Sequence, residues 1–373
     1  MKIESVVLRE LSVRLKFRFE TSFGVEQDLR KLVLTVRSDG LEGYGEVTAG
    51  NVPGYSYETT DTAWVALERY ILPRVLGHDY ATPAELLAEL AGIRGHNMAV
   101  AALETAFWDL QAKAAGLPLW ALLGGVARAI PVGASIGIQP SVAETVAMAQ
   151  RHAEQGYRRL KFKIKPGWAV EPMTAVREAL PDMSLSVDAN SAFRLTDARV
   201  FRELDRLGLD YIEQPLAHDD LADHVKLQAM LSTPLCLDES IHSPADARKA
   251  LELGAGRVIN VKLGRVRGHL EARRASDVAL AFGAPVWCGG MLEMGIGRAH
   301  NLHMTSLAAF TLPGDTASAS RYWDEDIVAP QLEAKDGYQA LPEGPGLGVE
   351  LKGDLVERLT THKREFDAVA VRT

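Results

Sequence analysis

Several common features are scarce or missing in this sequence of 373 residues. It contains only two cysteines, Cys236 and Cys288, and they lie in separate apolar segments that resemble buried strands, so a disulfide framework is not expected. No run of about 18 apolar residues occurs, and residues 1–10 lack the charged-then-apolar order of a signal peptide. These absences predict a protein without a membrane span that resides in the cytoplasm.

A basic excess is also missing. The chain carries 41 Lys and Arg against 49 Asp and Glu, a net charge of -8, and its basic residues are scattered rather than clustered. A nucleic-acid surface requires clustered positive charge, so nucleic acid is not an expected partner. With 47% hydrophobic and 24% charged residues, the composition is that of a globular protein with a sizeable core. We expect its partner to be a small molecule.

The first third of the chain has the pattern of strands followed by helices. Asp39-Gly40 is a typical hairpin turn between two strand-like segments. Apolar residues then recur at helical spacing, and the last such segment is terminated by Gly116 and Pro118. The predicted strands are Ile3–Phe19, Lys31–Val36 and Gly43–Val47, and the predicted helices are Thr60–Leu76, Ala84–Leu90 and Met98–Ala115. This part is predicted to be an α+β unit.

From about Ile130 the pattern changes to short apolar runs that alternate with amphipathic helices, which is typical of parallel strands with crossover helices. The expected strands are Ile130–Ile138, Arg159–Ile164, Ser184–Val187, Tyr211–Ile212, Leu235–Leu237, Val258–Lys262 and Pro285–Cys288, with helices beginning near Val142, Val170, Thr196, Leu221, Pro244, His269 and Ile296. An eighth strand near Ala308–Leu312 would close the ring.

The predicted fold is therefore α/β, a modified (β/α)7β barrel of the TIM type with an α+β capping domain. We expect residues 1–125 to form the capping, or lid, domain and residues 126–320 the catalytic barrel. Residues 321–373 hold Gly and Pro turns and one amphipathic segment, and do not continue the repeat. We expect this C-terminal segment to return to the capping domain.

Ionisable residues recur where the predicted barrel strands end, which is where barrel enzymes place their active sites. Asp188, Glu213, Asp238 and Lys262 follow one another at intervals of 25, 25 and 24 residues, close to one strand-helix unit. Three carboxylates on adjacent strands need a hard cation to neutralise them. We predict a Mg²⁺ site, in which Mn²⁺ or Co²⁺ can substitute.

Lysines lie at two opposite points of the same ring. The second strand contains Lys161, Lys163 and Lys165 on one face, and Lys262 ends the sixth strand. A carboxylate substrate on the cation would present its α-carbon to one lysine on each side, the geometry for removing a proton from one face and returning it on the other. The cation would stabilise the enediolate, and the neighbouring ammonium groups favour one neutral amine.

At these residues the chain resembles the enolase superfamily, specifically its muconate-lactonizing-enzyme subgroup, a superfamily whose Lys or His bases act with Mg²⁺. Ala102–Asp109 and Pro118–Gly125 resemble the segment that leads from the family's lid into its barrel. The resemblance implies that Lys163 is the base on one face and Lys262 its partner, that Lys161 tunes Lys163, and that the three acids bind the metal. It also implies a homo-oligomer, either a dimer or an octamer.

Two comparisons within the superfamily narrow the choice of subgroup and of substrate class. The mandelate-racemase subgroup would need a His-Asp pair late in the barrel, whereas His300 and His303 lie in a predicted helix, where packing or surface roles are expected. Dipeptide epimerases carry Asp-x-Asp on the eighth strand for the substrate ammonium, but the matching stretch here is Asp315-Thr316-Ala317. The missing acid favours a substrate whose amine is acylated.

Substrate contacts are expected from loops that resemble those of N-acylamino acid racemases and o-succinylbenzoate synthases. These loops are Gly289–Arg298 after the seventh strand and the stretch around Phe19–Gly24 in the lid. Glu239 is a candidate for orienting the site, although surface or capping roles compete. The candidate substrate contacts are Ser135, Asn190, Gly290, Met291, Phe19 and Phe23. At several of these positions an ordinary structural role, at a strand end, in a turn or in the core, is the alternative. Tyr55 and Trp323 are expected either to line the pocket or to pack in the core.

The sequence thus predicts a metal-dependent racemase of N-acylamino acids, N-succinyl ones in particular, that acts by two-lysine 1,1-proton transfer. The alternative is o-succinylbenzoate synthase, a lyase of menaquinone biosynthesis, and one site could support both reactions. A dipeptide epimerase, a cycloisomerase and a non-catalytic scaffold are the remaining hypotheses.

Overall fold

A four-stranded antiparallel sheet forms the base of the capping region in the computed structural model, which describes residues 1–368. The sheet has the order β15-β1-β2-β3. Asp39 and Gly40 make the tight turn between β2 and β3 with φ of 49° and 76°, the left-handed pair that such hairpins require. The strands are β1 (Ser5–Glu20), β2 (Val25–Ser38), β3 (Leu41–Val47) and β15 (Thr360–Asp367).

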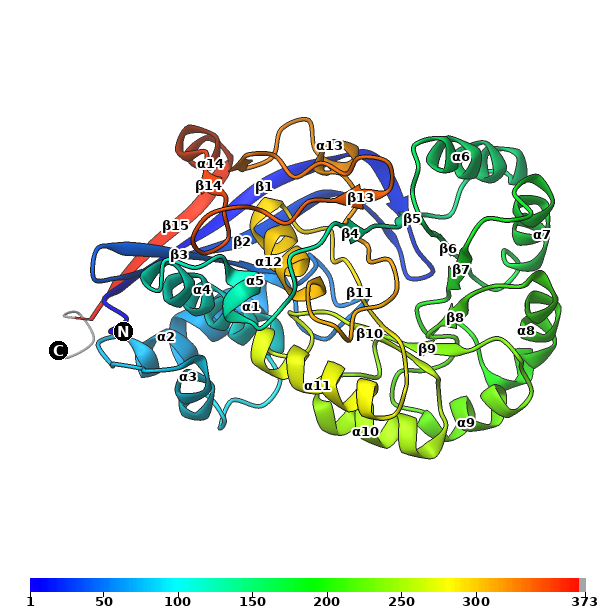
Figure 1. Ribbon diagram of the computed structural model, residues 1–373, viewed down its shortest axis with the longest axis horizontal. Coiled ribbons are helices and arrows are strands. Elements are labelled where there is room, and N and C mark those ends of the chain that lie inside the picture. Colours follow the sequence, from blue (N-terminus) through cyan, green and yellow to red (C-terminus); the bar gives the residue numbers. More distant parts are fainter. Residues whose placement is uncertain (369–373) are drawn as a thin grey trace.

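Helices cover one face of this sheet, as the blue and cyan part of Figure 1 shows. The long helix α4 packs against β2 and β3, and its small residues Ala102 and Ala106 allow close contact: a Cβ on Gly45 would lie 1.9 Å from the Ala102 carbonyl oxygen. The helical segments are α1 (Thr60–Ala66), the π-helical η1 (Leu67–Ile71), α2 (Leu72–Val75), α3 (Pro83–Glu89), α4 (Asn97–Ala114) and α5 (Leu119–Leu122).

The central part of the chain is a curled parallel sheet with the order β11-β10-β9-β8-β7-β6-β5. The strands are β5 (Ala134–Ile136), β6 (Leu160–Lys163), β7 (Leu185–Asp188), β8 (Tyr211–Glu213), β9 (Leu235–Leu237), β10 (Val258–Val261) and β11 (Val286–Cys288). Every residue of these strands is buried, which explains why they form nearly continuous apolar runs in the sequence.

Crossover helices form an arc outside this sheet (Figure 1). Ser141 and Ser243 accept a backbone N–H with their side chains at the start of α6 and α10, which explains where these two helices begin. The helices are α6 (Val142–Glu154), α7 (Val170–Ala179), the 3₁₀ turns η2 (Leu195–Asp197) and η3 (Asp205–Leu207) on either side of α8 (Ala198–Leu204), α9 (Leu221–Ala229), α10 (Pro244–Leu253), α11 (His269–Ala281) and α12 (Gly295–Thr305). The modified barrel predicted from the sequence is confirmed.

Two details of the barrel differ from prediction. The expected strand Ile130–Ile138 is divided, because β4 (Ile130–Pro131) pairs with β13 (Tyr338–Gln339) outside the barrel and only β5 joins it. The eighth strand is reduced to single bridges: Phe310 pairs with Val286, and Gly314 with Val132. Pro313 and Gly314 follow the apolar run directly, and Pro cannot donate to a ladder, so the ring is closed without a regular strand.

The C-terminal part crosses both regions. It includes α13 (Ala319–Tyr322), β12 (Val328–Ala329), β14 (Glu350–Leu351) and α14 (Gly353–Leu359) before β15. Strand β15 pairs with β1 over Ser5–Leu11, so the red and blue strands run side by side in Figure 1. The domain boundaries near residues 125 and 320 stay predictions. No helix among residues 1–368 has the length and apolarity of a membrane span, and both cysteines are buried and free.

Candidate active site

Three acids meet where β7, β8 and β9 end. In the parallel register Asp188 is opposite Glu213, and Asp238 follows β9 directly. All three are fully buried, and one oxygen from each lies within 4.8 Å of the others. The regular spacing seen in the sequence therefore brings three carboxylates into one cluster.

This cluster has the chemistry of a divalent-cation site. Carboxylate oxygens are the ligands of hard cations, and three buried carboxylates so close together repel one another unless positive charge intervenes. The pKa of Glu213 is raised by burial and by the negative charge of Asp188. The donor set fits a metal such as Mg²⁺, and Asp188, Glu213 and Asp238 would hold it.

Lys161 and Lys163 reach the cluster from β6, since alternate residues of a strand point to the same side. Lys163 Nζ donates to Asp188 Oδ2 at 2.7 Å and to Asn190 Oδ1 at 2.8 Å. Lys161 Nζ lies 2.9 Å from Glu213 Oε2 and 3.4 Å from Asp188 Oδ2. Both lysines are therefore held against the acids that would bind the metal.

Lys262 approaches from the opposite side, directly after β10. Its Nζ donates to Asp238 Oδ2 at 2.9 Å and lies 4.3 Å from the centre of the Tyr55 ring. The Tyr55 hydroxyl donates to Asp238 Oδ1 at 2.8 Å, and Arg265 pairs with the same oxygen. A cation–π contact and a shared carboxylate thus fix the position of Lys262.

The charges around Lys161 and Lys262 favour the ammonium form of these two lysines. Burial opposes protonation of Lys262, but its electrostatic interactions with Tyr55 and with the carboxylate of Glu213 raise its pKa above the ordinary value. Burial likewise opposes protonation of Lys161, and Asp315 and Glu213 raise its pKa. Burial disfavours ionisation of Asp188, yet Lys163 and Lys161 lower its pKa to about 2. A cation on these carboxylates would compete with the lysines for their negative charge.

Asp315, the single acid in the eighth-strand segment, is neutralised by two cations. Lys161 Nζ lies 2.8 Å and Arg159 Nη2 2.9 Å from its carboxylate, and all three side chains are buried. Burial opposes ionisation of Asp315, but Lys161 and Arg159 lower its pKa. Its charge is therefore already balanced within the protein.

The predicted substrate contacts divide between two neighbouring cavities. The inner chamber is at the barrel mouth and is lined by, among others, Ser135, Lys161, Lys163, Lys262, Gly290 and Asp315. The outer pocket lies between capping region and barrel and is lined by, among others, Phe23, Lys31, Tyr55, Met98, Asn190 and Met291. Phe19, Lys163, Lys262, Gly290 and Leu292 line both cavities.

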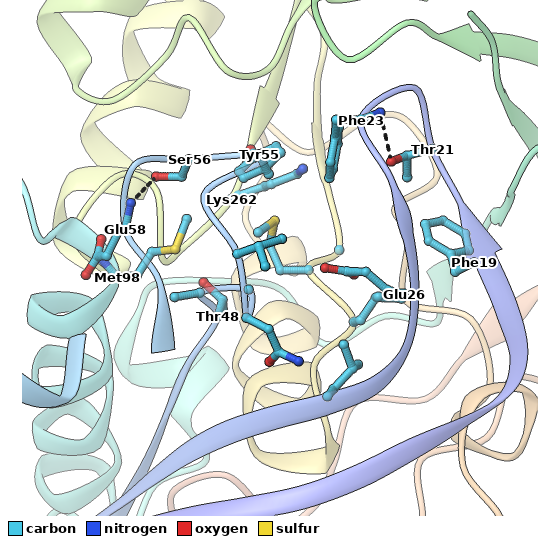
Figure 2. A pocket seen from close by; sticks show the side chains of 18 of the residues that line it. Phe19, Thr21, Phe23, Glu26, Thr48, Tyr55, Ser56, Glu58, Met98 and Lys262 are labelled. Atoms are coloured by element: carbon cyan, nitrogen blue, oxygen red, sulfur yellow. Dashed lines mark hydrogen bonds between the residues drawn. The ribbon is translucent and has the colours of Figure 1, made fainter. Parts of the chain in front are cut away.

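Two loops of the capping region close over the outer pocket (Figure 2). Phe23 comes from the β1–β2 turn and Tyr55 from the loop after β3, and both side chains project toward Lys262. The loops also contact each other, because a Cβ on Gly54 would lie 2.7 Å from Phe23 Cδ2. Phe19 lies deeper, with its ring centre 6.0 Å from Lys163 Nζ.

Glu239 is connected to Lys163 through Asn190 rather than directly. It accepts from Asn190 Nδ2 at 2.9 Å, and Asn190 in turn accepts from Lys163. Burial and the charge of Asp188 raise the pKa of Glu239 to about 7. The connection Glu239–Asn190–Lys163 agrees with an orienting role for Glu239.

Some residues are placed away from the site. Lys165 lies beyond the end of β6, is 40% exposed and pairs with Glu20 at 2.8 Å, so the prediction that it shares a buried face with Lys161 and Lys163 was wrong. His300 and His303 are buried in α12, where their rings bond to the Tyr44 and Leu347 carbonyls. These histidines join the barrel to its neighbours, and Trp323 is also buried in the core.

Sequence reasoning missed three polar residues at the site: Asn260, Arg265 and the ion-paired Arg159. Asn260 donates to Glu213 Oε1 at 2.7 Å and accepts from Gly289 N at 2.9 Å. The two-residue alternation of β10 places it on the same face as Lys262, and this signal could have identified it. Arg265 follows the strand without such periodicity, and Arg159 reaches Asp315 across 156 residues.

Comparison with known proteins places this site in a family. Residues 3–124 match the N-terminal domain of the mandelate racemase / muconate lactonizing enzyme family, and residues 144–355 match the enolase C-terminal domain-like model. Together the two matches cover most of the chain. The chain belongs to the mandelate racemase / muconate lactonizing enzyme family of the enolase superfamily.

Two curated relatives align over nearly the full length. An N-succinylamino acid racemase of Thermus thermophilus is 56% identical, covering 99% of this chain and all of that protein. An o-succinylbenzoate synthase of Geobacillus kaustophilus is 51% identical, with 99% of each chain covered. Among solved structures, an enolase-superfamily member from Listeria innocua matches with a TM-score of 0.95 at 35% identity, covering 99% of this chain and 100% of that chain.

Proposed function

We propose that the protein racemises N-acylamino acids, N-succinylamino acids in particular. The observation that carries this proposal is the position of Lys163 and Lys262, which come from strands four apart in the ring and line the same inner chamber on either side of the acidic cluster. One lysine can face each side of an α-carbon between them. The relative named N-succinylamino acid racemase, at 56% identity, supports the same substrate class.

In the proposed reaction Lys163 as a neutral amine removes the α-proton from one face, and the C–H electrons move into the substrate carboxylate to give an enediolate. Lys262 as an ammonium returns a proton to the opposite face, and the reverse reaction exchanges these roles. Bound Mg²⁺ would supply positive charge for the second negative charge that develops on the carboxylate. Asn190 holds Lys163, and Tyr55 holds Lys262.

The ion pairs of Asp315 support a substrate whose amino group is acylated rather than free. A dipeptide presents an ammonium group that needs an unpaired acid, but the Asp315 carboxylate already forms ion pairs with Arg159 and Lys161. An amide nitrogen carries no charge and makes no such demand. The paired state of Asp315 therefore favours an N-acyl substrate over a dipeptide.

The second candidate is o-succinylbenzoate synthase activity, favoured by relatives of that name at 51% identity. The same base would remove the α-proton, and hydroxide would leave from the adjacent carbon. Lys262 would then only stabilise charge. We further infer a homo-oligomer, a dimer or an octamer, in the cytoplasm; both inferences rest on the sequence.

The decisive experiment incubates the purified protein with Mg²⁺ and N-succinyl-L-phenylalanine in D₂O, with α-proton loss followed by NMR and racemisation by optical rotation. Wild type should exchange and racemise. Lys163→Ala and Lys262→Ala should each lose at least roughly 100-fold in racemisation. Lys165→Ala should remain active, because Lys165 lies just beyond the end of β6 and pairs with Glu20. If wild type is silent while o-succinylbenzoate forms from its precursor, the racemase proposal fails and the synthase stands.

A further inference from the structure

One wall of the outer pocket contains a buried cation that the proposed chemistry does not use. Lys31 belongs to β2, between Leu29 and Val33 on the strand face that joins the barrel core. It is only 3% exposed, yet it lines the outer pocket. A lysine in an apolar strand face is costly unless its charge is balanced.

Within residues 1–368 the Lys31 ammonium has no ion-pair partner within 4.0 Å. Its one hydrogen bond is to the Met291 carbonyl oxygen, at 3.0 Å, although an ammonium has three donors. The neighbouring Arg30 differs, because it pairs with Glu10 and Asp61. Two Lys31 donors are thus left for a ligand in the pocket.

Glu46 does not supply the missing partner. It is near enough for Lys31 to oppose the rise of its pKa, which burial brings to about 7, but its two carboxylate oxygens accept the backbone N–H groups of Met294 and Gly297 at 2.9 Å each. Glu26 also lines the outer pocket and is only half-buried, so water screens its charge.

The position of Lys31 relative to the lysine pair indicates what the ligand is. Lys31 is tied to Met291, and the preceding Gly290 lines both cavities together with Lys163 and Lys262. A substrate whose α-carbon lies between the two lysines can extend its N-acyl chain past Gly290 into the outer pocket. An acyl chain that ends in a carboxylate would then meet an unpaired ammonium.

We propose that Lys31 is the specificity-determining residue that binds the distal carboxylate of a succinyl chain. This inference rests on the proposed function and deepens it. Charge complementarity in a buried pocket would favour the dicarboxylate substrate over an equally shaped neutral one. The o-succinylbenzoate precursor carries a succinyl chain as well, so the same anchor would serve both candidate reactions.

The test compares N-succinyl-phenylalanine with N-succinamoyl-phenylalanine, which has the same shape but a neutral terminal amide. Wild type should prefer the succinyl substrate in kcat/KM by roughly tenfold or more, the size expected for a charged hydrogen bond. Lys31→Met and Lys31→Gln should both reduce this preference to about threefold or less, mainly through a higher KM for the succinyl substrate. Lys31→Gln keeps a donor for the Met291 carbonyl, so it separates the effect of losing the positive charge from the effect of losing the hydrogen bond to Met291.

Each other outcome has a definite meaning. An equal fall for both substrates would make Lys31 a structural link between β2 and the loop containing Met291, and would overturn the inference. A retained preference in Lys31→Gln would also overturn it. Turnover of neither substrate by wild type would instead refute the proposed racemase function, and melting temperatures of the variants separate loss of binding from loss of folding.

Discussion

Buried carboxylates occur in two regions of this molecule, and they are neutralised differently. At the barrel mouth Asp188, Glu213 and Asp238 face lysine and arginine side chains. At the contact between capping region and barrel, Glu46 and Glu104 accept backbone N–H groups at the first turns of α12 and α11. Within the capping region, Glu58 does the same at the first turn of α4.

The difference shows which acids are available for chemistry. Glu104 accepts from His269 N and Leu270 N and from the Trp108 indole, so its oxygens are occupied by groups that cannot leave. The acids at the barrel mouth are held instead by lysine and arginine side chains, whose positive charge a bound metal cation could replace. The acids bound by backbone amides therefore stabilise the fold, whereas the cluster of Asp188, Glu213 and Asp238 has the geometry to bind a metal.

The largest expected effect is at a metal-site acid. Glu213→Gln should weaken Mg²⁺ binding by at least roughly 100-fold, since even residues behind metal ligands contribute 10–100-fold. The melting temperature without metal should not fall, because the change relieves repulsion with Asp188. Isothermal titration calorimetry and thermal unfolding measure the two quantities. Unchanged Mg²⁺ affinity would remove Glu213 from the site.

A smaller effect is expected at a helix-capping acid. Glu104→Ala leaves two buried amides of α11 and the Trp108 indole without an acceptor and should lower the free energy of unfolding by about 2 to 3 kcal/mol. Glu104→Gln keeps one acceptor and should cost less. Urea unfolding checks both variants, with racemisation by the folded fraction expected to persist. Equal costs for Ala and Gln would contradict the capping role.

The smallest effect is a pH dependence of stability. Burial raises the pKa of Glu58 from its ordinary value of 4.5 to about 7, so the folded state binds its proton more tightly than the unfolded state. The resulting stability is complete below the unfolded pKa and is lost as pH rises through the folded one. Between about pH 5 and pH 7 wild type should lose roughly 1 to 2 kcal/mol more than Glu58→Gln. Parallel unfolding curves would show that Glu58 does not titrate in this range.

Much of the barrel mouth, with its acids and lysines, could be predicted because the strand-helix unit of the barrel repeats. Each barrel strand is followed by one helix of similar length, so residues at successive strand ends recur about every 25 positions, and parallel pairing then places them side by side. Two-residue alternation within β6 did the same for Lys161 and Lys163. It failed for Lys165, because the strand ends before that residue.

Local patterns do not reach contacts between distant segments. Tyr55 contacts Asp238 across 183 residues and Lys31 contacts Met291 across 260, and no spacing rule relates the segments that contain them. The eighth barrel segment was mispredicted for a related reason. Its apolar run makes a single bridge, from Phe310 to Val286, and Gly314 beyond it makes another to Val132; the neighbouring strands rather than the composition of the run determine this.

The sequence alone determined the order of strands and helices, the barrel, and the lysines and acids at its mouth, because hydrophobic periodicity and parallel pairing are local and repetitive. Only the tertiary structure decided which buried acids already have ion-pair or hydrogen-bond partners within the protein. Burial within the barrel pairs Asp315 with two cations. The approach of the capping region places Glu104 at the first turn of α11 and leaves Lys31 with one backbone acceptor. These contacts depend on which side chains share a low-dielectric interior, and this is decided only when the distant segments of the chain pack together.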